Sequence, residues 1–226
     1  MPGMDERSLK IRVDAKRDVS ALLLEPPAVI ACYVFAHGAG AGMTHPFMAK
    51  VARGLAERGV ATLRFQFPSM EAGVKRPDPP AVAQAAVRAA VAEAARALPG
   101  VALVAGGKSF GGRMTSRAQA ADPLPGVRGL VFVGFPLHPA GKPSDERAQH
   151  LDQVRIPMLF LQGTRDALAE MPRMAAVAAR LGERATLARF EDADHSFHVP
   201  ARAARNDAAV LAELLDTIRG WVARLA

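Results

Sequence analysis

Short apolar runs alternate with longer amphipathic segments along most of this chain. The runs are rich in β-branched and aromatic residues and are bounded by glycine, proline or polar residues, which is typical of buried strands. We predict strands at Val29–Ala36, Val60–Phe65, Val101–Ala105, Leu130–Gly134, Met158–Gln162 and Ala185–Phe190.

Between these runs, apolar residues recur at helical spacing. The spacing predicts helices at about Pro46–Arg58, Pro80–Leu98, Gly112–Ala121, Asp145–Val154, Pro172–Leu181 and Ala203–Leu225. Strands that alternate with helices form right-handed crossovers and a parallel sheet. We therefore predict an α/β fold with a mostly parallel central sheet flanked by helices. Ile11–Val13 and Ser20–Leu24 are expected to form an antiparallel hairpin at the amino-terminal edge.

Length and composition suit one compact unit. The chain has 226 residues, 50% of them hydrophobic, and we expect a single domain over residues 1–226 with an ample core. Met1–Lys10 is charged and lacks the apolar segment of a signal peptide, and no apolar run approaches the ~18 residues of a membrane span. The lone cysteine, Cys32, is expected to be a buried thiol in a reducing cytoplasm.

The net charge is +7, and a basic balance can indicate nucleic acid or an anionic surface as partner. Here the arginines are scattered, form no run, and accompany no nucleic-acid motif. Solvated helix faces explain them better, so we expect neither a nucleic-acid nor a membrane partner. The alanine and arginine bias indicates a GC-rich bacterial genome.

Gly106-Gly-Lys-Ser-Phe-Gly-Gly112 stands between a predicted strand and a predicted helix. Gly107-Lys-Ser109 also looks like the end of a phosphate-binding P-loop, but that motif needs a glycine at position 102, which is alanine. The remaining interpretations are a glycine-rich turn with an incidental serine and the G-x-S-x-G nucleophile elbow. The elbow lifts a serine, here Ser109, above the end of a sheet.

Two later strands are followed by the groups that such a serine needs. Asp166 follows one strand within Gly163-Thr-Arg-Asp166, where its alternative role is to cap a helix. His195 follows the last strand, with His198 as the second candidate base. A base is required because a serine hydroxyl is a poor nucleophile at neutral pH. The order serine, aspartate, histidine is that of the α/β-hydrolase triad rather than of the other two known triad orders.

An oxyanion hole needs two preorganised backbone N–H donors. The amide of Phe110, directly after the nucleophile, is one candidate. The other is expected from the loop His37-Gly-Ala-Gly-Ala-Gly42, where Ala39 is the first choice and Gly40 the second. His37 is expected to support this loop, because no partner cluster suggests a metal site. The chemistry requires no metal and no organic cofactor.

Taken together, these motifs resemble the α/β-hydrolase superfamily over essentially the whole chain. More narrowly, the loop at residues 37–42, the elbow at residues 107–113, Phe135-Pro-Leu-His-Pro139 and the segment at residues 163–166 resemble a family of small lidless hydrolase-like proteins. That family is distantly similar to dienelactone hydrolases and related to a subunit of a eukaryotic chromatin-acetylation complex. The resemblance implies an α/β-hydrolase fold. Dienelactone hydrolases use a cysteine nucleophile where this chain has Ser109, which argues against that particular substrate.

The segment between the strand at residues 130–134 and the next strand is too short for a lid domain. The site should therefore be open and favour small or exposed acyl groups. Lys108, Arg113 and His138 are candidates to recognise an anionic group of the substrate. For Lys108 and Arg113 the alternative is that they hold loops in place through salt bridges and backbone hydrogen bonds. Phe67, Met70 and Phe135 are candidates for an apolar wall, with core packing as the alternative for each.

We therefore expect a serine hydrolase of the carboxylesterase or thioesterase type that acts on a small-molecule acyl substrate, as a monomer or homodimer. Two alternatives remain open. One is an acyltransferase or perhydrolase that uses the same triad, and the other is a non-catalytic binding or scaffold protein that keeps the fold.

Overall fold

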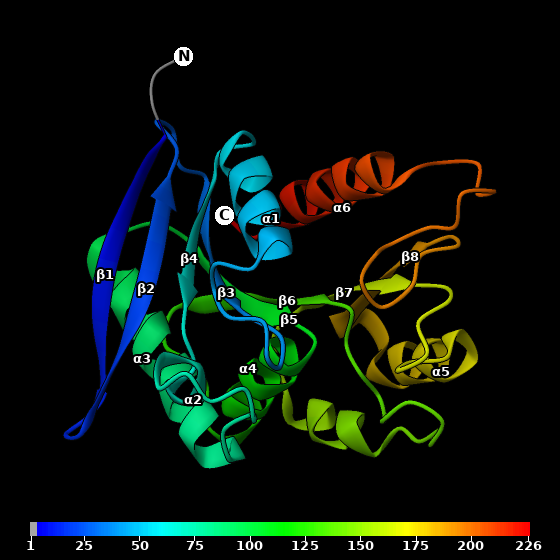
Figure 1. Cartoon of the computed structure of the whole chain (residues 1–226), viewed down its shortest axis with the longest axis horizontal. Helices are drawn as coiled ribbons and strands as arrows, with labels where there is room; N and C mark the ends of the chain where they lie inside the picture. Colours follow the sequence, from blue (N-terminus) through cyan, green and yellow to red (C-terminus); the bar gives the residue numbers. More distant parts are fainter. Residues whose placement is uncertain (1–3) are drawn as a thin grey trace.

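The computed structural model describes residues 4–226, which form an eight-stranded sheet with helices on both faces (Figure 1). The strand order is β1-β2-β4-β3-β5-β6-β7-β8. The strands are β1 (Asp5–Asp14), β2 (Arg17–Glu25), β3 (Ala31–Ala36), β4 (Val60–Phe65), β5 (Leu103–Lys108), β6 (Val127–Val133), β7 (Met158–Gly163) and β8 (Ala185–Phe190). The predicted mostly parallel sheet is confirmed, because only β1 and β2 run antiparallel to their neighbours.

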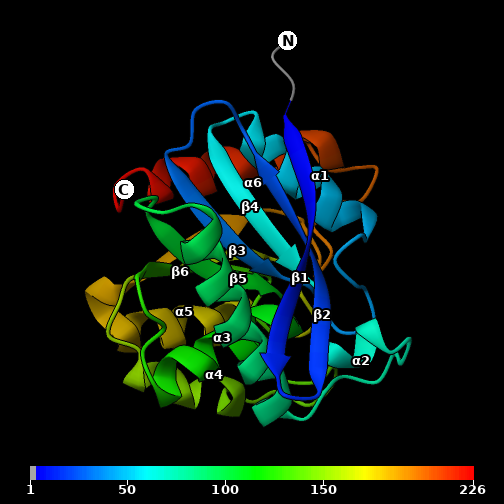
Figure 2. The ribbon, with the colours of Figure 1, turned by 90° about the vertical axis from the view of Figure 1, so that its left-hand side faces the viewer.

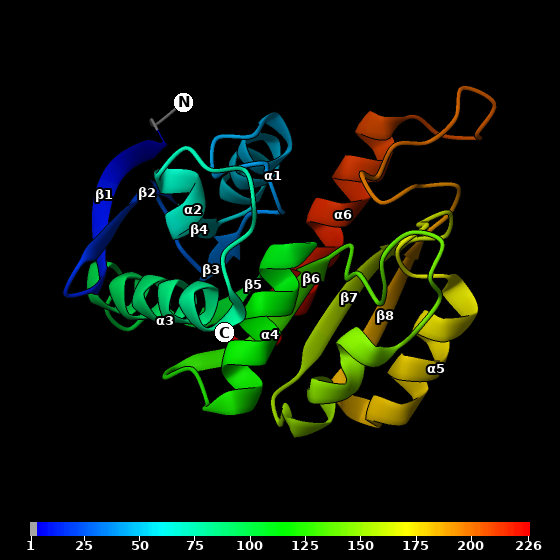
Figure 3. The same cartoon turned by 60° about the horizontal axis from the view of Figure 1, so that its bottom comes forward.

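The helices divide into two layers. They are α1 (Pro46–Ala56), α2 (Pro68–Glu71), α3 (Pro80–Ala97), α4 (Phe110–Ala121), α5 (Met171–Leu181) and α6 (Asp207–Val222), with the 3₁₀ helices η1 (Glu146–Gln153) and η2 (Gly182–Arg184). Figure 3 shows α3, α4 and α5 along one face of the sheet and α1 with α6 on the other. Figure 2 shows the hairpin of β1 and β2 lying beside β4.

Alternation along the central strands supplies both layers with a core. In β3, Cys32 and Val34 pack toward α3 and α4, whereas Tyr33 and Phe35 pack toward α1 and α6. Successive side chains of a strand point to opposite faces, so an apolar run of this kind is buried on both sides. All six residues of β3 are buried, and so are all six of β4.

Some predicted boundaries change. The segment predicted as a helix at Asp145–Val154 forms the 3₁₀ helix η1, and the short helix α2 was not predicted. The last helix begins at Asp207 rather than Ala203, because the Asn206 side chain accepts a hydrogen bond from the Ala209 amide and caps it there. Helix α4 begins at Phe110, directly after Ser109.

The predicted absence of a lid is confirmed for the described residues. Between β6 and β7 the chain forms a loop and η1, and no further domain is inserted there. Within residues 4–226, no helix combines the length and the apolar character that crossing a membrane requires.

Candidate active site

The turn from β5 into α4 places Ser109 in an unusual backbone conformation, with φ 50° and ψ −112°. Such a conformation costs a non-glycine residue about 1–3 kcal/mol and persists only where the surrounding structure enforces it. Close backbone approach enforces it here. A Cβ atom at Gly107 would lie 2.3 Å from the Ala36 carbonyl oxygen, and one at Gly111 would lie 2.4 Å from the same atom. Glycine is therefore required on both sides of the serine.

The structure brings the side chains of Ser109, His195 and Asp166 into one hydrogen-bonded chain. His195 Nε2 lies 2.9 Å from Ser109 Oγ, and His195 Nδ1 lies 2.7 Å from Asp166 Oδ2. When Nδ1 donates to the carboxylate, Nε2 keeps a lone pair that accepts the serine hydroxyl. The three residues follow β5, β7 and β8, whose carboxyl ends meet at one edge of the sheet.

Asp166 is 3% exposed, and three groups donate hydrogen bonds to its carboxylate. Besides His195, the carboxylate accepts hydrogen bonds from the Gln162 side-chain amide and, at 2.8 Å, from the Leu168 backbone amide. Gln162 is itself held, because its Oε1 accepts from the Phe135 amide at 3.0 Å. Asp166 does not cap α5, which begins at Met171. The carboxylate is thus fixed toward the imidazole.

The loop that carries His195 is held from two sides. Asp194 Oδ1 accepts hydrogen bonds from the Ser196 and His198 amides at 2.7 and 3.0 Å. On the side of β5, Lys108 Nζ donates to the His195 carbonyl oxygen at 2.5 Å. Burial lowers the pKa of Lys108 to about 8, although the carboxylates of Asp166 and Asp194 favour its charged form. Lys108 thus supports the loop, which was one of its two predicted roles, and it also lines the cleft described below.

His198, the second candidate base, points elsewhere. Its exposed ring donates from Nδ1 to Asp207 Oδ2 at 2.8 Å, at the first turn of α6. The hydrogen bond to Asp207 and the charge of that carboxylate raise the pKa of His198. The geometry leaves His195 as the base within reach of Ser109.

The predicted oxyanion loop is held by His37. Its Nδ1 donates to the Gly38 carbonyl at 2.8 Å, and its Nε2 accepts from the Phe67 amide at 3.1 Å. Burial lowers the pKa of His37, which agrees with a neutral ring that donates at one nitrogen and accepts at the other. As expected, this histidine supports the loop.

The amides of Ala39 and Phe110 have no acceptor among residues 4–226. Phe110 is the first residue of α4, where an amide lacks a partner within its own helix. Ala39 lines the same cleft as Ser109, whereas the second choice, Gly40, does not line it. The two first-choice donors are thus both available beside the serine.

A cleft of about 310 Å³ opens above Ser109, on the side of the sheet that α1 covers. Its walls are largely apolar. The lining residues are Gly38, Ala39, Ala41, His45, Phe47, Met48, Lys108, Ser109, Leu168, His195 and Ser196. The volume of the cleft is enough for a small organic group beside the serine hydroxyl.

The three residues predicted as an apolar wall are not among the residues that line the cleft. Phe67 is 1% exposed and packs edge-on against His37 and Phe110. Phe135 is fully buried against Phe132 and Phe160. Both belong to the core on the α3–α4 side of the sheet, so for these two residues the alternative of core packing is the one observed. Met70 lies behind the oxyanion loop, close to Gly42.

Arg113 and His138, predicted near the substrate, lie around a second cavity instead. Leu168 separates the two cavities: it lines the cleft, and its carbonyl accepts hydrogen bonds from the amides of Leu137 and His138, which line the second cavity. Neither cavity holds a metal cluster, since residues 4–226 contain no group of three or more histidine, cysteine or carboxylate side chains placed to hold an ion.

Several residues of the site were not predicted. Gln162 is a lone polar residue at the end of an apolar strand, and that position beside Gly163 was a readable signal. Phe47 and Met48 begin an ordinary amphipathic helix, and Leu168 and Ser196 stand in loops, so their sequence carries no comparable mark.

With this geometry in place, comparisons with known proteins become informative. The model of a family described as alpha/beta hydrolase domain matches residues 29–223. Among solved structures, the chain is similar to dienelactone hydrolase from Anabaena variabilis, with 20% identity, a TM-score of 0.78 and 98% of each chain covered. It is also similar to a serine hydrolase homologue from Coxiella burnetii (19% identity, TM-score 0.74, 99% of each chain).

A third similar structure is that of a serine hydrolase without a lid from Xanthomonas campestris. The identity is 22% and the TM-score 0.73, over 97% of this chain and 96% of the other. At such identities the likeness concerns the fold. The predicted α/β-hydrolase fold without a lid domain is thereby confirmed.

Proposed function

Since this chain belongs to the α/β-hydrolase family, we propose that it is a serine hydrolase that cleaves small or exposed acyl esters or thioesters. One observation carries the proposal: the unbroken chain of hydrogen bonds from Asp166 through His195 to Ser109, beside two unpaired backbone amides. A scaffold protein has no physical reason to keep these groups in register.

In the proposed reaction, Ser109 Oγ attacks the acyl carbonyl carbon while its proton passes to His195 Nε2. The carbonyl π electrons move onto oxygen, and the amides of Ala39 and Phe110 stabilise the resulting oxyanion. Collapse expels the alcohol or thiol, which takes the proton from His195, and leaves an acyl group on Ser109. Asp166 holds the ring and stabilises the imidazolium.

Water then repeats the sequence against the acyl-enzyme. It gives its proton to His195 Nε2 as its oxygen bonds to the acyl carbon. The second oxyanion collapses with Ser109 as leaving group, and Ser109 recovers the proton from His195. The acid is released and the site returns to its starting state. No cofactor takes part in this sequence.

The cleft suits acyl groups of modest size. About 310 Å³ lies at the small end of the usual range for ligand sites, and its walls of alanine, phenylalanine, methionine and leucine offer little to a polar acyl chain. The absence of a lid in the described residues leaves room for a bulky leaving group outside the cleft.

A panel of p-nitrophenyl esters and acyl thioesters tests the proposal, with Ser109→Ala and the matched variant Ser8→Ala on the exposed edge strand β1. We expect Ser109→Ala to lower kcat at least about a hundredfold, because it removes the nucleophile, and Ser8→Ala to leave it unchanged. Equal turnover in both variants would overturn the assignment.

The same panel separates hydrolysis from acyl transfer. Turnover in water, in added alcohol and in added peroxide is followed by product analysis. We expect free acid as the main product, because the open cleft admits water to the acyl-enzyme. Ester or peracid as the main product would instead identify an acyltransferase or perhydrolase.

A further inference from the structure

The second cavity has a volume of about 410 Å³ and lies on the far side of Leu168 from the Ser109 cleft. Helix α4 and the segment that follows β6 form it. The lining residues are Arg113, Arg117, Leu137, His138, Pro139, Lys142, Ser144, Glu146 and Arg147. Four of these nine are arginine or lysine.

None of the four cations has a carboxylate partner within residues 4–226, although the Arg113 guanidinium lies over the Phe110 ring, 6.0 Å from its centroid. Arg113, Arg117, Lys142 and Arg147 take part in no ion pair and in no side-chain hydrogen bond there. The lone carboxylate of the lining, that of Glu146, is likewise unpaired. The cavity thus concentrates positive charge that the described residues do not neutralise.

The charges act on one another and on their surroundings. Burial lowers the pKa of Arg113, and the like charges of Arg147 and Arg117 lower it further. Nearby, burial lowers the pKa of His150 to about 4, with Arg117 and Arg113 as the next causes. Arg113 Nε is buried without a hydrogen-bond acceptor in the described part of the chain. Arg117 and Lys142 are exposed and Arg113 and Arg147 are partly buried, so the like charges of the cluster repel one another, and a bound anion would relieve that repulsion.

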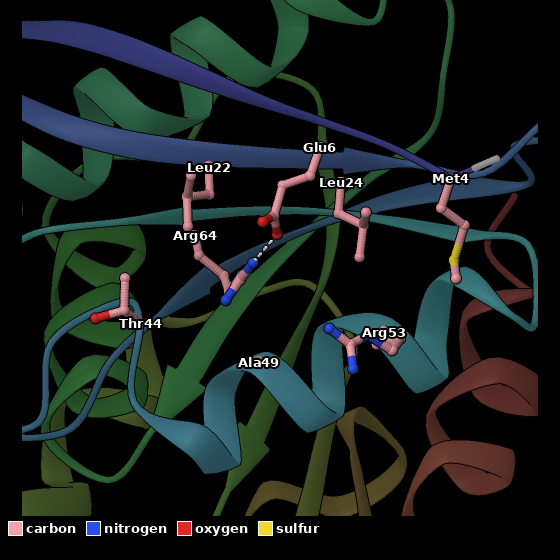
Figure 4. A pocket seen from close by; sticks show the side chains of 8 residues that line it. All are labelled: Met4, Glu6, Leu22, Leu24, Thr44, Ala49, Arg53 and Arg64. Carbon is pink, nitrogen blue, oxygen red and sulfur yellow. Dashed lines mark hydrogen bonds and ion pairs between the residues drawn. The ribbon is translucent and has the colours of Figure 1, made fainter.

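A third cavity, between the hairpin and α1, contains an arginine that is buried beside a carboxylate of the chain (Figure 4). The Arg64 side chain is 3% exposed, and its guanidinium contacts the carboxylate of Glu6 and donates to the Met43 carbonyl oxygen. Its Nε also lacks an acceptor, so the two sites differ in charge rather than in that atom. The charge of Arg64 is paired with a carboxylate of the chain itself, whereas that of Arg113 has the Phe110 ring and no ion pair among the described residues.

We propose that Arg113, Arg117, Lys142 and Arg147 bind an oxyanion of the phosphate class, and that this is an acidic group of the acyl substrate. Three guanidinium groups and an ammonium suit a doubly charged oxyanion better than a single carboxylate, because guanidinium forks bind such groups bidentately. The identity of the bound group as part of the substrate rests on the proposed function.

The position of the cavity relative to the serine supports that identity. Arg113 lies one helical turn after Ser109, and its amide donates to the Ser109 carbonyl at 3.1 Å. A turn of α-helix advances the chain by about 5–6 Å. The two cavities thus meet at the Ser109–Arg113 turn, and a substrate with its acyl carbon at Ser109 would have to extend around Leu168 to bring a phosphate group to these cations.

Binding is tested first, by calorimetric titration of inorganic phosphate and pyrophosphate at low salt into Ser109→Ala protein. Two double variants of that protein are compared. The cavity pair carries Arg117→Gln and Arg147→Gln, and the charge-matched control pair carries Arg189→Gln and Arg219→Gln. The control arginines are exposed and lie away from the cavity, on β8 and α6. We expect the cavity pair to weaken binding at least about tenfold and the control pair to change it little. Equal weakening, or no binding at millimolar phosphate, would overturn the site.

Kinetics then identifies the source of the phosphate. Two esters with the same acyl group, one with a neutral and one with a phosphorylated leaving group, are compared in otherwise wild-type protein. If the cavity binds a phosphate group of the substrate, the cavity variant should raise KM for the phosphorylated ester about tenfold and leave KM for the neutral ester unchanged. Free phosphate should then compete only with the phosphorylated ester. If free phosphate instead alters turnover of the neutral ester and the cavity variant abolishes that effect, the cavity serves an effector and the substrate assignment is wrong.

The two failures are distinguishable. Calorimetry uses protein without the nucleophile and needs no turnover, so it tests the cavity even if neither ester is cleaved. Circular dichroism melting of every variant excludes misfolding as the cause of lost binding. The single variant Arg117→Gln, on the exposed side of α4, provides a milder second test.

Discussion

The two cavities on either side of Leu168 handle charge in opposite ways. At the Ser109 site, the charged groups are bonded within the described chain: Asp166, behind the cleft, accepts hydrogen bonds from His195, Gln162 and the Leu168 amide, and Lys108 donates to the His195 carbonyl. In the cavity around Arg113, four cations outnumber the single carboxylate of Glu146, and none of them forms an ion pair among the described residues. The first site is complete before a ligand arrives, and the second is complete only with one.

This contrast separates reaction from recognition. Acyl transfer needs groups fixed before the substrate binds, because preorganised donors cost no rearrangement at the moment of reaction. Selection of a substrate by its charge instead needs a surplus of unpaired charge in the free protein, which the correct ligand then neutralises. On this account, changes in the cleft act mainly on kcat, whereas changes in the cation cavity act on KM for one class of ester.

The largest effect is expected from the histidine in the cleft. His195→Gln should lower kcat at least about a hundredfold, because it removes the base that takes the serine proton. His198→Gln removes a histidine only three positions away and should retain activity, since that ring bonds to Asp207. Steady-state kinetics on a neutral ester measures both. Equal losses would show that the loop as a whole, rather than the base, had been damaged.

A smaller effect is expected from Lys108, the cation of the cleft. With its folded pKa near 8 and an unfolded value of 10.5, the unfolded chain holds a proton that the folded protein lacks between these pH values. Lys108 should therefore increase the free energy of unfolding as pH rises from about 8 to 10.5. Urea midpoints measured from pH 7.5 to 10.5 check the slope.

Lys108→Met should remove that rise and lower kcat about tenfold, because the His195 carbonyl loses its donor. Lys10→Met, on the exposed edge strand β1, serves as the matched control and should keep both properties. A pH slope unchanged in Lys108→Met would assign the rise to another group.

The smallest effect concerns His150, which lies near the uncompensated cations. Its folded pKa is about 4 and its ordinary value 6.5, so the unfolded state alone gains a proton in this range and stability should fall as pH drops from 6.5 to 4. Thermal melts of wild type and His150→Gln across that window test this. The loss should be smaller in the variant and also in Arg117→Gln, whose charge contributes to the lowered pKa. Identical curves for all three proteins would contradict the assigned role of the cations.

Whether a site residue could be predicted from the sequence depends on its position relative to the strands. Ser109, Asp166 and His195 each follow an apolar run, and the carboxyl ends of parallel strands meet, so their approach could be predicted before the structure was known. The cleft walls could not. Phe67 and Phe135 follow strands as well, but their side chains enter the core on the α3–α4 side, whereas the cleft opens toward α1.

Only part of the cation cavity could be predicted from the sequence. Arg113 and Arg117 are four residues apart, a spacing that places them on the same side of a helix. Lys142 and Arg147 join them only through the path of the loop after β6, which no periodicity describes. His138 was expected near the substrate, yet its ring donates from Nδ1 to the Pro139 carbonyl and faces Glu170 through Nε2.

Labelling with a fluorophosphonate probe tests the central claim most directly, because only an activated serine attacks such a reagent at neutral pH. The modified peptide is located by mass spectrometry in wild type, Ser109→Ala and Ser8→Ala. The account predicts one label, on Ser109, retained in Ser8→Ala and lost in Ser109→Ala. Folded wild-type protein that takes up no label would contradict it and would favour the alternative of a non-catalytic binding protein that keeps the hydrolase fold.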